Sequence, residues 1–133
     1  MVAMKAKSGH ITLTTSASFK KLAPVYEELY MKFLKEAGQL PEDDEIVQTY
    51  IRSNMMDIEK DRKPEGYNRP GEMRLIFPMD TKEVSFYVYS PFKSQKVVKV
   101  TESLSKVLRE NGFKHSIDWD QMLIDQAKRA QKP

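Results

Sequence analysis

The stretch EVSFYVYS, Glu83 to Ser90, alternates apolar and polar side chains with a period of two residues. That period predicts a strand with two faces of different character. One face carries Val84, Phe86 and Val88, and the other carries Ser85, Tyr87 and Tyr89. The run EMRLIFPM, residues 72–79, comes just before it, so the two together predict a hairpin. Because proline cannot donate to a ladder, Pro78 predicts that the first of these strands lies at an edge or ends there.

Elements on the N-terminal side of the hairpin are also well marked. HITLTT, residues 10–15, alternates β-branched residues and predicts a short strand. A first helix is predicted from Pro24 to Gly38 by apolar residues at helical spacing. A second helix is predicted to open at Pro41, with the acidic EDDE in its first turn and a buried apolar stripe. That stripe is Ile46, Val47, Tyr50, Ile51, Met55 and Ile58.

The C-terminal third predicts a helix, a strand and a last helix. KVVKV, residues 96–100, fits either a third strand or the approach to a helix, and Thr101 is the expected cap of a helix that stops at Gly112. FKHSIDW, residues 113–119, alternates like a strand, and a short helix follows over 120–130. This order predicts one α+β domain over residues 1–133, with three to four helices on a small, mostly antiparallel sheet.

Composition excludes several classes of protein and of site. The 133 residues are 40% hydrophobic and 31% charged, which is typical of a globular domain. No apolar run approaches the roughly 18 residues of a membrane helix, and the N-terminus does not resemble a secretion signal. The chain has no Cys, which excludes disulfides and thiolate metal sites. We therefore expect a cytoplasmic protein without membrane contact, cofactor or metal site, and the sequence favours a binding protein over an enzyme.

Charge is segregated along the chain. Residues 1–25 contain four Lys and no acid, whereas residues 26–46 contain seven acids and two Lys. Most of those acids are explained as helix-terminal charge on a wet surface. The net charge of +3 and the concentration of cations in 80–114 nevertheless favour an anionic partner on one side of the molecule.

The favoured hypothesis is a non-enzymatic, regulatory protein that binds nucleic acid, preferably single-stranded. Two phenol rings two residues apart can stack bases, and cations can contact the phosphates between them. The predicted contact residues are Tyr87, Tyr89, Phe92, Lys93, Lys96 and Lys99, helped by Lys5 and Lys7. The same pattern also fits a half-buried strand with an outer face guarded by lysine.

A second hypothesis is an adaptor or inhibitor that binds a protein of a larger nucleic-acid machine. Two amphipathic helices and many flexible Met side chains suit an adaptable contact surface, although most Met are expected to fill the core. The predicted edge strand could also pair with the same strand of a second copy, so the sequence is compatible with a homodimer.

A third hypothesis comes from a resemblance. GHITLT, residues 9–14, resembles the His-x-Thr element of two-histidine phosphoesterases. The resemblance implies that His10 and Thr12 grip a phosphate and that a second His, here His115, completes an acid–base pair. In this sequence His115 is followed by Ser116 and Ile117, so the second element departs from the motif.

Overall fold

The computed structural model describes residues 5–13, 18–78 and 83–120. In chain order the elements are β1 (Ser8–Leu13), the 3-10 helix η1 (Phe19–Leu22), α1 (Ala23–Ala37), α2 (Asp44–Glu59), β2 (Arg74–Ile76), β3 (Ser85–Tyr89), α3 (Ser94–Glu110) and β4 (His115–Trp119). The α+β class is confirmed. The predicted last helix, over 120–130, lies outside the described residues apart from Asp120.

Four strands form one antiparallel sheet in the order β2-β3-β1-β4. The predicted hairpin strands β2 and β3 are paired, and β2 lies at an edge of the sheet, as Pro78 indicated. The outer edge of β2 has some of its backbone groups hydrogen-bonded, because the backbone of Tyr67 exchanges two hydrogen bonds with that of Leu75. Without α2, the order of helices and strands is the split βαβ arrangement, βαββαβ.

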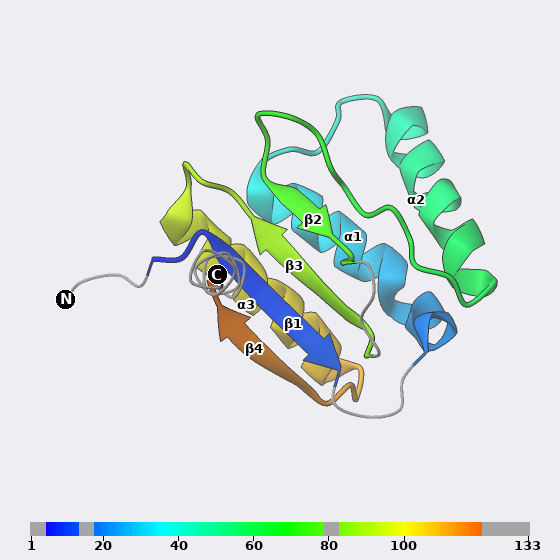
Figure 1. Cartoon of the computed structure of the whole chain (residues 1–133). Coiled ribbons are helices and arrows are strands. Elements are labelled where there is room, and N and C mark those ends of the chain that lie inside the picture. Colours follow the sequence, from blue (N-terminus) through cyan, green and yellow to red (C-terminus); the bar gives the residue numbers. More distant parts are fainter. Residues whose placement is uncertain (1–4, 14–17, 79–82, 121–133) are drawn as a thin grey trace, which may run out of the picture.

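Helices α1 and α3 lie together on one face of the sheet, behind the strands in Figure 1, and α2 packs against α1 beyond the β2 edge. The strand residues that face the two helices are apolar and buried, among them Ile11, Phe86 and Val88. They meet Phe33, Leu104 and Leu108 from the helices in a single core. Alternation along each strand therefore decides which side chains face the two helices and which face the other side of the sheet.

The start of α3 corrects one prediction. The helix begins at Ser94, so the whole of KVVKV is helical and Thr101 is not its cap. The Thr101 hydroxyl instead donates to the Val97 carbonyl within the helix. Val97 and Val100 are completely buried, and their packing against the sheet outweighs the strand preference of β-branched residues.

A close approach between β1 and α3 fixes where that helix lies. A Cβ placed on Gly9 would come within 2.3 Å of the Thr101 hydroxyl oxygen. Only a residue without a side chain allows this separation, so Gly9 sets the distance between helix and strand.

The ends of the first two helices follow local rules. Gly38 ends α1 with φ of 70°, the left-handed conformation that glycine adopts without strain. The second helix begins at Asp44, later than Pro41, and Asp43 caps it by accepting from the Glu45 amide. Ile46, predicted in the buried stripe, is exposed in the first turn of α2, and the buried stripe begins one residue later at Val47.

Candidate nucleic-acid interface

The second face of the sheet, called the open face below, carries no helix of the described residues. Strand register places ten side chains on it: Ser8, His10, Thr12, Arg74, Ile76, Ser85, Tyr87, Tyr89, Ser116 and Asp118. They form cross-strand rows, because Tyr87 lies opposite both His10 and Ile76, and His10 lies opposite Asp118. The two predicted tyrosines therefore lie on the same face of a central strand, as their spacing required.

A stacked aromatic pair occupies the centre of the open face. The His10 and Tyr87 rings are 4.5 Å apart between centroids and 15° from parallel. Burial raises the pKa of the Tyr87 phenol above its ordinary value, the charge of Arg74 lowers it, and Tyr89 raises it. The pair comes from β1 and β3, so the two middle strands supply its rings.

Arg74 is a cation of the open face that the sequence interpretation missed. It lies directly opposite Tyr89 across the β2–β3 ladder. Its place on this face follows from alternation, since its neighbour Leu75 is buried toward the helices. Its position beside Tyr89 depends on the strand register, which the local sequence does not specify.

Three of the other predicted contact residues gather at the start of α3. Phe92, Lys93 and Lys96 line a cleft of about 340 Å³ together with Lys5 and Gln95. Phe92 is 84% exposed, more than any other large apolar side chain of the described residues. The cleft residues lie close to the end of β3 along the chain, because Tyr89 is the last residue of that strand and Phe92 follows three positions later.

The lysines do not accompany the tyrosines on the open face. Lys96 and Lys99 belong to α3, which packs on the opposite face of the sheet, and Lys99 is exposed there. The Lys96 ammonium lies 3.2 Å from the Cβ position of Gly38, at the C-terminal end of α1, where a cation is favoured. The predicted contact residues thus fall into two regions, the aromatic open face and the cationic cleft. Lys99 lies outside both.

The two histidines do not come together. His10 is on the open face, whereas His115 pairs with Leu13 and is on the helix-covered face. The two-histidine arrangement that GHITLT suggested is therefore absent from the fold. Thr12 shares the open face with His10, but no second His faces it.

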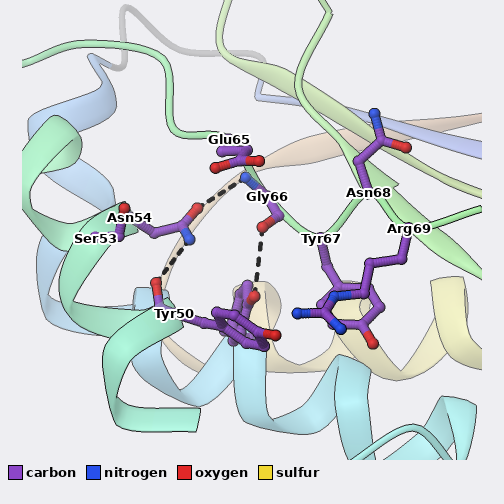
Figure 2. Close-up of a pocket in the computed structure, with 9 residues that line it drawn as sticks. Tyr50, Ser53, Asn54, Glu65, Gly66, Tyr67, Asn68 and Arg69 are labelled. Carbon is purple, nitrogen blue, oxygen red and sulfur yellow. Dashed lines mark hydrogen bonds between the residues drawn. The ribbon is translucent and has the colours of Figure 1, made fainter. Parts of the chain in front are cut away.

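A small cavity between α2 and the loop 64–72 has a structural explanation (Figure 2). The Asn54 side-chain oxygen accepts from the Tyr26 hydroxyl and the Gly66 amide, each at 2.8 Å, and its nitrogen donates to the Tyr50 carbonyl. The Arg69 guanidinium covers the Tyr50 ring at 4.8 Å. The buried polar atoms of Asn54 thus have partners within the chain, which holds the loop against the helices.

Other kinds of site find no support in the part of the chain that the structure describes. Residues 5–13, 18–78 and 83–120 contain no group of three side chains suited to holding a metal ion. None of the described helices has the length and apolar character needed to cross a membrane. Searches of family models, curated proteins and solved structures find no match to the chain.

Proposed function

We propose that this protein binds single-stranded nucleic acid through the open face of its sheet. The observation that carries the proposal is the stacked pair of His10 and Tyr87 on the two middle strands, with Tyr89 beside it. Four-stranded sheets with aromatic side chains on one face are a recurrent platform for unpaired bases. Each stacked base contributes roughly 1–3 kcal/mol, whatever its identity.

Cations near the rings supply the second part of the interaction. Arg74 lies next to Tyr89 and can contact a phosphate or stack on a base. The cleft at Lys5, Phe92, Lys93 and Lys96 includes residues that come soon after the end of β3 in the chain. A strand of several nucleotides would run across the open face past Tyr89 and place its next phosphates among these lysines. Lys99, exposed on α3, is a peripheral contributor to the same field.

The test is fluorescence anisotropy with a labelled single-stranded oligonucleotide across a salt series. Replacing both Tyr87 and Tyr89 with Ala should weaken binding by tenfold or more, since two stacking surfaces are lost. Replacing both with Phe keeps the rings and should preserve binding. Failure of the wild-type protein to bind at low salt, or full binding by the Ala double variant, contradicts the proposal.

Two double lysine variants distinguish phosphate contacts in the cleft from general electrostatic attraction to the protein. Lys93→Met with Lys96→Met should reduce the salt slope by about two, one unit for each phosphate contact. Lys60→Met with Lys63→Met removes the same charge from exposed positions after α2 and should leave the slope nearly unchanged. Equal reductions in both variants would mean that net charge alone drives binding.

A different surface region supports the alternative function, an adaptor or inhibitor that binds a protein. Leu40 and Ile46 are 41% and 42% exposed and flank the acidic residues 42–45. An exposed apolar and acidic corner suits a partner helix with basic and apolar residues. This alternative predicts a protein partner that is retained from a nuclease-treated lysate and lost after Ile46→Lys.

A further inference from the structure

A second cleft lies between the end of α3 and strand β4, on the helix-covered side of the sheet. Its volume is about 470 Å³, within the range of small-molecule sites. The side chains that line it are Ser105, Arg109, Phe113, Lys114, His115 and Ile117. It is separate from the open face, since His115 and Ile117 point to the other side of β4 from Ser116 and Asp118.

The turn after α3 builds this cleft. The Phe113 amide donates to the Leu108 carbonyl and the Gly112 amide to the Arg109 carbonyl, with Gly112 at φ of 82°. This is the hydrogen-bond pattern of a helix closed by a left-handed glycine. The chain therefore reverses sharply, and His115 comes back beside Ser105, ten residues earlier.

A hydrogen-bonded chain defines the floor of the cleft. The His115 Nδ1 lies 2.9 Å from the Phe113 carbonyl oxygen, which can only accept, so Nδ1 carries a proton. In the neutral ring the Nε2 then accepts from the Ser105 hydroxyl. Ser105 is 2% exposed, and its oxygen also accepts from the Arg109 guanidinium at 3.5 Å. The floor is thus held in place before any ligand arrives.

The rim of the cleft is cationic. Arg109 and Lys114 are exposed, and among the described residues neither has a carboxylate within 4.0 Å, whereas their neighbour Lys106 pairs with Glu110. Arg109 uses one of its five N–H groups on Ser105, so others remain for a planar, bidentate contact. Phe113 and Ile117 supply an apolar wall beside these charges.

We propose that this cleft binds a small phosphomonoester with an apolar or aromatic group. Arg109 and Lys114 would hold the phosphoryl oxygens, and Phe113 and Ile117 would cover the organic part. The charged side chains that line the cleft with His115 are Arg109 and Lys114, and β1 contributes the apolar Leu13 opposite His115.

The test uses the two histidines of the chain, because His10 is an internal control on the opposite face. Phenyl phosphate is titrated into the full chain at low ionic strength while the imidazole proton resonances are followed. We expect a saturable shift of the His115 resonances, with a Kd of about 1 mM or tighter, and none at His10. No saturable shift at His115, or equal shifts at both rings, overturns the proposal.

Variants and ligand comparisons test the roles of the lining residues. Arg109→Met should weaken binding of phenyl phosphate tenfold or more, and Arg52→Met on the exposed side of α2 should not. Ser105→Ala should weaken it several-fold. If Arg109 serves only to complement the end of α3, its variant will lose stability but bind normally, which overturns the assignment. Inorganic phosphate should bind more weakly than phenyl phosphate, and equal affinity contradicts the ester part of the proposal.

Discussion

The two faces of the sheet are built from the same strands but differ in almost every physical respect. On the helix-covered face, Ile11, Phe86 and Val88 are at most 2% exposed and belong to one continuous apolar core. On the open face, His10, Tyr87 and Tyr89 are half-buried, and their neighbours are Arg74 and Asp118. The covered face is mostly apolar and excludes water, whereas the open face combines aromatic rings with polar and charged side chains.

This difference shows how a small domain separates stability from recognition. Each strand alternates between the two faces, so neighbouring residues such as Phe86 and Tyr87 serve different purposes. Changes on the covered face should reduce the free energy of unfolding, whereas changes on the open face should act mainly on binding.

The largest effect is expected from the pair Phe86 and Tyr87. Phe86→Ala should lower the free energy of unfolding by about 3–5 kcal/mol, because it leaves a cavity beside Phe77. Tyr87→Ala should cost only about 1 kcal/mol, mainly the stack on His10. Urea denaturation followed by circular dichroism measures both values. Similar losses in the two variants would show that the two faces are not distinct.

A smaller effect is expected at Gly9, where the covered face approaches α3. Ala normally stabilises a strand relative to Gly, but here the new Cβ would overlap the Thr101 side chain. Gly9→Ala should therefore destabilise the protein by about 1–3 kcal/mol. Ser116→Ala, on the open face of β4, should change stability by less than about 0.5 kcal/mol. Stabilisation by Gly9→Ala would contradict the close contact between β1 and α3.

The third prediction concerns alkaline pH. Burial raises the pKa of Tyr26 and of Tyr30 well above 10.0, so the folded protein keeps both phenols protonated where the unfolded chain has lost these protons. Their contribution to stability is complete below pH 10 and is lost as the pH rises toward their folded pKa values. The free energy of unfolding should thus fall above pH 10, by up to about 1.4 kcal/mol per pH unit for each phenol.

Tyr26→Phe provides the control for this effect. The variant loses the hydrogen bond to Asn54, but its stability should decline less steeply with pH than that of the wild type. Denaturant titrations at a series of alkaline pH values give the two slopes. Identical slopes would mean that the buried phenol is not responsible.

The parts of the fold that local periodicity controls were predictable from sequence. Alternation in EVSFYVYS separates the faces of β3, and Gly38 ends α1 where a left-handed residue is needed. The sequence did not decide between strand and helix for KVVKV, because its β-branched residues favour a strand and only packing on the sheet makes them helical. The exposure of Ile46 likewise depends on where α2 starts.

The candidate site was predictable in part. The sequence indicated the shared face of Tyr87 and Tyr89. It also placed Phe92, Lys93, Lys96 and Lys99 on one surface with these tyrosines, whereas Lys96 and Lys99 belong to α3 on the other side of the sheet. It did not indicate the partners that come from other strands. Arg74 beside Tyr89 and His10 on Tyr87 depend on strand register, which long-range pairing determines. The meeting of Ser105 with His115 depends in the same way on the tight turn after α3.

The most direct test of the account is to observe the rings of Phe86, Tyr87 and Tyr89 by NMR while a single-stranded oligonucleotide is added. Bases stacked on the open face should shift the Tyr87 and Tyr89 ring protons upfield and leave those of Phe86 nearly unmoved. If the oligonucleotide binds but the two Tyr rings do not respond, the open face is not the contact surface and the central claim is wrong.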